Sequence, residues 1–137
     1  MTARYALIMP PISMGVLMLI AAFFGPWDAE RWLGLALTLV GHAFLAAARM
    51  QLGESFSVAA EARALVTHGL YARVRNPIYL FSAIAVTGFF LYLHWHWGLL
   101  LLLVLVPLQV KRARTEAQVL EQQFGDAYRA YRAHTWF

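Results

Sequence analysis

Two polar segments carry nearly all of the side chains that could bind a ligand or act on it. They span residues 49–77 and 111–137, and the rest of the chain is mostly apolar. Carboxylates can accept hydrogen bonds from an ammonium or a diol, guanidinium groups can bind carboxylates or phosphates, and tyrosine rings offer faces to a cation or an aromatic ring. The sequence has no cysteine and no HExxH, GxSxG, Walker or dinucleotide-binding glycine motif. Thiolate chemistry is therefore excluded, and we predict no metal site.

The elements that position these segments are long apolar stretches. Of the 137 residues, 61% are hydrophobic and 13% are charged, against about 45–50% and about 25% in soluble domains. This composition excludes a soluble globular enzyme and intrinsic disorder. The apolar stretches are Tyr5–Phe24, Trp32–Ala48, Ile78–Leu93 and Trp97–Val110. We predict a single all-α integral membrane domain over residues 1–137, with about four transmembrane helices, a cytosolic loop and a C-terminal amphipathic helix.

The first and fourth stretches need separate interpretation. A signal peptide is the alternative for the first, but Tyr5–Phe24 is longer than a usual signal core and lacks a small-residue cleavage site. The fourth stretch covers only about 21 Å as a helix, less than a hydrocarbon core of about 30 Å. We therefore expect it to begin at the membrane interface and to continue into the tail, with Lys111 and Arg112 reaching toward the headgroups.

The positions of the basic residues predict the orientation. With both termini in the cytosol, ten of the eleven Lys and Arg residues lie inside, and Arg31 alone lies outside. This distribution follows the positive-inside rule and fits a bacterial-type inner membrane. The tryptophans at the outer ends of the stretches are Trp27, Trp32, Trp95 and Trp97. Membrane topology thus accounts for the basic charge, and we predict no nucleic-acid partner.

The apolar stretches offer little chemistry of their own. They contain no Asp, Glu, Lys or Arg, which argues against a proton-coupled transporter. His42 is expected to be a packing residue, and His94 and His96 are a thin basis for a metal site. Small residues at Gly34 and Gly41 can pack helices within one chain or between chains, so the oligomeric state stays open.

The tail has the pattern of an amphipathic helix. The residues that recur at near-helical spacing are Ala113, Ala117, Leu120, Phe124 and Tyr131. Gly125 is expected to end this helix, and Asp126 to cap a second short one. Without further information, a helix lying on the lipid surface explains this pattern.

Both polar segments together resemble a known family. Residues 52–57, 65–71 and 75–79 read LGESFS, LVTHGLY and RNPIY, and the tail places a glutamate, a leucine, Phe-Gly and two tyrosines in order. These motifs resemble the isoprenylcysteine carboxyl methyltransferase and phospholipid methyltransferase family from Leu52 to Tyr131. The sequence has Leu70, Asn76 and Ala117 where the family commonly has proline, histidine and a second glutamate.

The resemblance implies an integral membrane methyltransferase that uses S-adenosyl-L-methionine (SAM) and takes a lipophilic acceptor from the bilayer, at the cytosolic face. The cofactor contacts that it implies are Arg63, Ala64, Leu65, Val66, Tyr71, Asn76, Pro77, Ile78, Tyr79 and Glu116. It places Arg112 on the acceptor side, and Arg75 suits a carboxylate, so both are predicted catalytic residues. Methyl transfer in line requires mainly that donor and acceptor be aligned and water excluded.

Other interpretations remain open at this point. Glu116 and Arg112 are four residues apart and can form an ordinary surface ion pair on a helix. A non-catalytic accessory module with the same fold is the main alternative function, and a small transporter is a further one. The acceptor is also open among phospholipid amines, isoprenoid lipids and small carboxylates.

Overall fold

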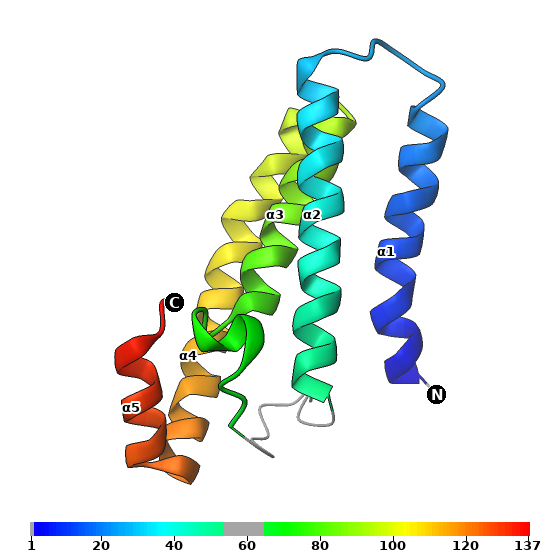
Figure 1. The fold of residues 1–137 in the computed structure, drawn as a ribbon. Coiled ribbons are helices and arrows are strands. Elements are labelled where there is room, and N and C mark those ends of the chain that lie inside the picture. Colours follow the sequence, from blue (N-terminus) through cyan, green and yellow to red (C-terminus); the bar gives the residue numbers. More distant parts are fainter. Residues whose placement is uncertain (1, 54–64) are drawn as a thin grey trace.

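The chain folds into helices that run alternately in opposite directions (Figure 1). This computed structural model describes residues 2–53 and 65–137, with side chains described for residues 10–53 and 65–137. The elements are α1 (Thr2–Ala21), α2 (Ala29–Leu52), η2 (Gly69–Ala72), α3 (Pro77–Tyr92), η3 (His96–Leu101), α4 (Leu102–Phe124) and α5 (Asp126–His134). Within these ranges there is no strand, only an isolated bridge between Val74 and Trp136. The predicted all-helical fold is confirmed.

Among the described helices, α2 and α3 pack against each other most extensively. Gly34, Thr38 and Gly41 are buried on one face of α2, and small residues face them from α3. A Cβ at Gly41 would lie 2.7 Å from the Ala85 backbone nitrogen, and one at Gly88 would lie 2.5 Å from that of Thr38. The two backbones can approach this closely only because no side chain stands between them. The small residues of the second apolar stretch therefore pack helices within one chain.

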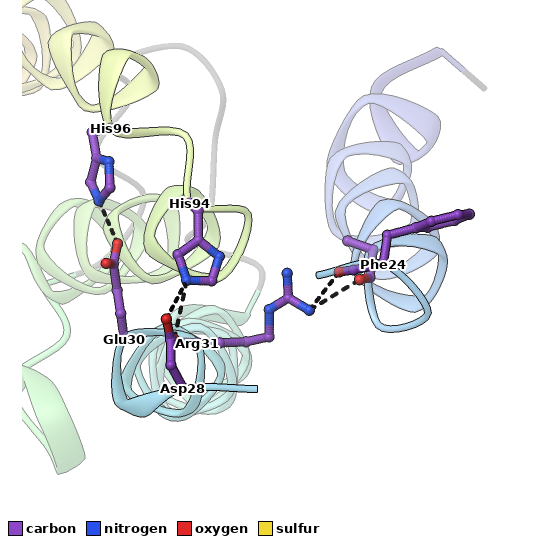
Figure 2. A network of polar contacts seen from close by, with 7 residues as sticks. Phe24, Asp28, Glu30, Arg31, His94 and His96 are labelled. Atoms are coloured by element: carbon purple, nitrogen blue, oxygen red, sulfur yellow. Dashed lines mark hydrogen bonds and ion pairs between the residues drawn. The ribbon is translucent and has the colours of Figure 1, made fainter. Parts of the chain in front are cut away.

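Helix α1 is held to α2 and α3 through Arg31. The Arg31 side chain is 4% exposed, and its Nη1 donates to the carbonyls of Ala21 at 3.2 Å and Phe24 at 2.8 Å. Figure 2 shows this guanidinium pointing at the carbonyl end of α1. A cation at a helix C-terminus is stabilised by the helix dipole. The first apolar stretch runs to Phe24, but α1 ends at Ala21, and the Phe24 carbonyl beyond its end accepts a hydrogen bond from Arg31.

Two acid–histidine pairs connect the start of α2 to the turn after α3, at the same end of the molecule. The Nε2 atom of His94 lies 3.0 Å from a carboxylate oxygen of Asp28, and that of His96 lies 2.5 Å from one of Glu30. Figure 2 shows the two pairs side by side. Each histidine is thus paired with its own acid, and the described residues contain no group of three metal-ligating side chains.

We expect the pair of Asp28 and His94 to make the fold less stable in acid. The Arg31 backbone N–H donates to the Asp28 carboxylate at 2.9 Å, and that bond and the His94 contact hold the Asp28 pKa below its usual value of 3.8. A carboxyl group whose pKa is lower in the folded state than in the unfolded state stabilises the fold at pH values above the unfolded-state pKa. This contribution is lost as the pH falls through the folded-state pKa. Asp28→Asn keeps an acceptor for the helix cap but no longer titrates. We expect Asp28→Asn to have a lower melting midpoint than the original chain near neutral pH. Between about pH 5 and pH 3 we expect its melting midpoint to fall less than that of the original chain.

Thermal unfolding in detergent, followed by circular dichroism across that pH range, measures this effect. Asp126→Asn is the matched control, since the Asp126 side chain is 99% exposed. Identical pH profiles for Asp28→Asn and the control would show that the Asp28 pair contributes nothing to stability.

Helix α4 continues the fourth apolar stretch far into the polar tail. It runs without a break past Val110 to Phe124 and is capped by Gly125, whose φ of 52° lies in the left-handed region. Gly125 holds the N-cap position of α5 and Asp126 is its first helical residue, so the prediction that Asp126 caps this helix was wrong. In the described part of the chain, two helices, Ala29–Leu52 and His96–Phe124, are long and apolar enough to cross a membrane, and the apolar helices Pro10–Ala21 and Pro77–Tyr92 are shorter.

Candidate functional site

One cluster of polar side chains joins the two motif segments. The Tyr79 hydroxyl, in the first turn of α3, donates to Glu116 Oε1 on α4 at 2.5 Å. The Nε of Arg112, one turn earlier on α4, donates to the same oxygen at 3.2 Å. The Glu116 side chain is 29% exposed and that of Arg112 is 45% exposed. The structure thus brings three of the predicted site residues into direct contact at the boundary between protein and solvent.

Tyr71 lies close to this cluster. It sits in η2 with its ring buried, and its pKa is raised above the usual value, first by burial and then by the charges of Tyr131 and Glu116. Tyr131 on α5 donates its hydroxyl to the Tyr71 carbonyl at 2.7 Å. Burial, together with Tyr128, raises the pKa of Tyr131 to about 12. Both phenols therefore stay protonated at neutral pH, and Tyr131 acts as a hydrogen-bond donor that holds α5 against η2.

The segment before α3 is held by the end of the chain. The Trp136 N–H donates to the Arg73 carbonyl at 2.7 Å, and the N–H groups of Arg75 and Asn76 donate to the carbonyls of Trp136 and Phe137, each at 3.0 Å. The Asn76 carbonyl in turn accepts bonds from the first turn of α3. The Asn76 side chain makes no capping bond, although Asn76 holds the N-cap position of α3. Its backbone nevertheless fixes where α3 begins.

Pro77 and Ile78 follow as the first residues of α3. Pro77 is fully buried, and it is placed where its missing N–H leaves no hydrogen bond unmade. Ile78 is half-buried, as are Leu65 and Val66 in the irregular run before η2. Two further predicted contacts, Arg63 and Ala64, lie outside the described residues.

A cavity of about 470 Å³ opens between α4, α5 and the segment before α3. Its lining residues are Arg75, Asn76, Val110, Ala113, Arg114, Ala117, Gln118, Glu121, Tyr128, Arg132 and Phe137. We call this cavity the α4–α5 pocket. Of the predicted site residues that the structure describes, only Arg75 and Asn76 belong to this lining. The structure therefore divides the predicted site between the Tyr79–Glu116–Arg112 cluster and this pocket.

Sequence reasoning missed Arg114, Glu121, Tyr128 and Arg132 as candidate functional residues. Part of the signal was available, because positions 110, 114, 117 and 121 recur at helical spacing and so share one face of α4. The fold of α5 back onto that face was not visible in the pattern, since it depends on Gly125 and on the bond from Tyr131 to Tyr71.

One known protein family matches most of the chain. Residues 29–127 match the phospholipid methyltransferase family, a range that includes α2, α3, α4 and the whole Tyr79–Glu116–Arg112 cluster. No curated protein sequence matches the chain. Since the family match covers well over half of the residues, the chain belongs to the phospholipid methyltransferase family.

Proposed function

We propose that the protein transfers a methyl group from SAM to a lipid-like acceptor at the cytosolic face of a membrane. Family membership supports a methyltransferase that acts on lipid-like substrates. The observation that carries the proposal is the contact of Tyr79 and Glu116, which stand in different motif segments and share a hydrogen bond. A carboxylate held in this way is oriented before any ligand arrives.

The residues around this contact suit the parts of SAM. When bound, SAM supplies an activated methyl group on a sulfonium, together with an ammonium, a carboxylate, a ribose diol and an adenine. Glu116 can accept strong charge-assisted bonds from the ammonium or the diol. The faces of Tyr71 and Tyr79 suit the sulfonium or the adenine. We assign the remaining cofactor contacts to Arg63, Ala64, Leu65, Val66, Asn76, Pro77 and Ile78, and the carboxylate to Arg75.

Arg112 is the proposed contact of the acceptor. Its side chain is about half exposed, and it stands just after the point where α4 changes from apolar to charged. A guanidinium at this level can orient a carboxylate or a phosphate by paired hydrogen bonds. Its contact with Glu116 supports an acceptor bound next to the cofactor, and alignment of the two reactants is the main demand of the reaction.

The proposed membrane arrangement has four spanning helices with both termini in the cytosol. Large apolar side chains are exposed along three of the helices, for example Leu19 at 68%, Leu39 at 61% and Leu103 at 71%. Exposed apolar surface of this kind suits lipid contact. Arg31 lies at the end that also holds Trp27, Trp32, Trp95 and Trp97. Among the described residues, the basic side chains of the two polar segments lie toward the opposite end, as the positive-inside rule requires for a cytosolic face. This arrangement puts the Tyr79–Glu116–Arg112 cluster at the cytosolic boundary.

Calorimetry on the purified chain in detergent tests the proposal. We expect SAM and its demethylated product S-adenosylhomocysteine to bind with dissociation constants tighter than about 1 mM, which corresponds to about −4 kcal/mol. A transfer assay with tritiated SAM and bacterial lipid extract then identifies the acceptor fraction. Absence of heat for both ligands at millimolar concentration would contradict the proposal and favour a non-catalytic membrane module.

A further inference from the structure

A second polar bridge joins α3 and α4, on the apolar side of the Tyr79–Glu116–Arg112 cluster. The Nε2 of Gln109 on α4 donates to the Ser82 hydroxyl on α3 at 2.8 Å. The Ser82 hydroxyl in turn donates to the Tyr79 carbonyl at 2.9 Å. Gln109 stands about one helical turn before Arg112, and Ser82 about one turn after Tyr79. The bridge therefore continues the polar cluster from the charged half of α4 into its apolar half.

Gln109 is chemically out of place in its stretch of sequence. The apolar stretch Trp97–Val110 contains no other amide, hydroxyl or charged side chain. A glutamine amide has two N–H groups and an acceptor oxygen, yet within the described residues the bond to Ser82 is the single hydrogen bond of this side chain. The residue is half-buried, and an unpaired polar group in an apolar environment costs free energy. One N–H and the oxygen are therefore open to a ligand that arrives from the bilayer.

Gln109 also lies between a cation and an apolar surface. Val106, Gln109 and Arg112 follow one ridge of α4 at steps of three residues, which places them about 4.5 Å apart along the helix axis. Val106 is 41% exposed and the Arg112 side chain is 45% exposed. From the charged half inward, the ridge thus presents a guanidinium, an amide and an alkyl group. An ester-linked phospholipid presents a phosphate, a carbonyl and a hydrocarbon chain in the matching order, with a glycerol unit between the first two.

We propose that Gln109 is a specificity-determining residue that donates a hydrogen bond to the carbonyl linking the acceptor's head to its hydrocarbon chains. The inference rests on the proposed function, in which Arg112 holds the anionic part of that head. It narrows the acceptor to lipids with a carbonyl linkage next to the head, since an ether linkage or a bare isoprenoid chain offers the amide no comparable acceptor. The same contact sets the depth at which the head meets Arg112.

Native mass spectrometry of the full chain in detergent tests this proposal without any measurement of methyl transfer. The probes are dioctanoyl phosphatidylethanolamine and its dioctyl ether counterpart, which share the headgroup and the chain length and differ in the carbonyls. We expect the ester lipid to bind about threefold to tenfold more tightly than the ether lipid, which is the range expected for one neutral hydrogen bond. Equal binding of the two lipids by the original chain, or binding of neither, would overturn the proposal.

Three variants separate recognition of the carbonyl from support of the fold. Gln109→Met keeps the length of the side chain and favours a helix, but it removes the amide, and we expect the preference for the ester lipid to disappear. Gln122→Met is the matched control on an exposed position of the same helix, and it is expected to keep the preference. Ser82→Ala removes the bridge to α3 and leaves the amide in place, so it is also expected to keep the preference.

The ratio of the two affinities is the decisive readout, because a loosened contact between α3 and α4 weakens both lipids alike. If Gln109→Met lowers both affinities by the same factor, Gln109 serves to join the helices and the proposal is overturned. Calorimetry with S-adenosylhomocysteine is a separate measurement. A preference for the ester lipid without cofactor binding contradicts the proposed function alone, and cofactor binding without that preference contradicts the role of Gln109 alone.

Discussion

Replacement of Gly34 or Gly88 by alanine is expected to force α2 and α3 apart and to destabilise the fold. A Cβ at Gly34 would overlap the backbone nitrogen of Tyr92, and one at Gly88 would lie 2.5 Å from the Thr38 nitrogen and 2.7 Å from the Gly34 carbonyl. These neighbours are backbone atoms of packed helices, so they cannot move aside as a flexible side chain can. We expect each substitution to cost about 1–3 kcal/mol or more of folding free energy.

Gly15 provides the matched control for these substitutions. It also lies in a helix, but a Cβ there meets nothing within 4 Å. Gly15→Ala is expected to be neutral or to stabilise α1 by up to about 1 kcal/mol, because alanine favours the helix over glycine. The melting midpoint and the fraction of monodisperse protein after detergent extraction measure both effects. If Gly88→Ala and Gly34→Ala melt like Gly15→Ala, the close approach of α2 and α3 is wrong.

Loss of the Glu116 charge is expected to have the largest effect on cofactor binding. Glu116→Gln keeps the size of the side chain and a hydrogen-bond acceptor for Tyr79, but it removes the charge proposed to hold SAM. A hydrogen bond to a charged group contributes about 1.5–3 kcal/mol, which corresponds to about a ten- to hundredfold loss of affinity. Calorimetric titration with S-adenosylhomocysteine measures this loss directly, and the rate of methyl transfer is expected to fall with it.

Tyr79→Phe separates a cofactor role of Glu116 from a structural one. It removes the hydroxyl that donates to Glu116 Oε1 and leaves the carboxylate in place. We expect a loss of about 1 kcal/mol of cofactor binding free energy or less, well below that of Glu116→Gln. Asp126→Asn controls for the change in net charge. If Glu116→Gln binds the cofactor as well as Asp126→Asn does, Glu116 serves only to pair with Tyr79 and Arg112.

The helix boundaries show what local sequence information can predict. The stretches Trp32–Ala48 and Ile78–Leu93 were predicted as helices, and the structure has α2 over Ala29–Leu52 and α3 over Pro77–Tyr92. The residues added at the start of α2 follow from the cap at Asp28, whose carboxylate accepts the Arg31 N–H. A polar capping residue lies outside the apolar stretch, so a prediction from apolar composition locates the middle of a helix better than its ends. That four helices cross the membrane stays a prediction.

The sequence motifs also predicted which residues belong to the candidate site better than they predicted which of those residues are in contact. Family motifs in the sequence named Tyr79, Glu116 and Arg112 together, and the structure places them in contact. The same motifs also named Arg75 and Asn76, which make no direct contact with that cluster and line the α4–α5 pocket. Neighbours in a motif can face different surfaces, because a turn before a helix sends successive side chains in different directions.

The sequence by itself determined the helical class, the two polar segments and the family to which the chain belongs. The length of apolar stretches, the positions of charged residues and the spacing of motifs can be read from the sequence without knowledge of tertiary contacts. Only the tertiary structure decided that His94 pairs with Asp28, that Arg31 holds the end of α1, and that α5 closes a pocket against α4. Each of these contacts joins different elements of the fold. Their partners depend on how closely α2 and α3 approach and on where Gly125 turns the chain, and no local pattern carries that information.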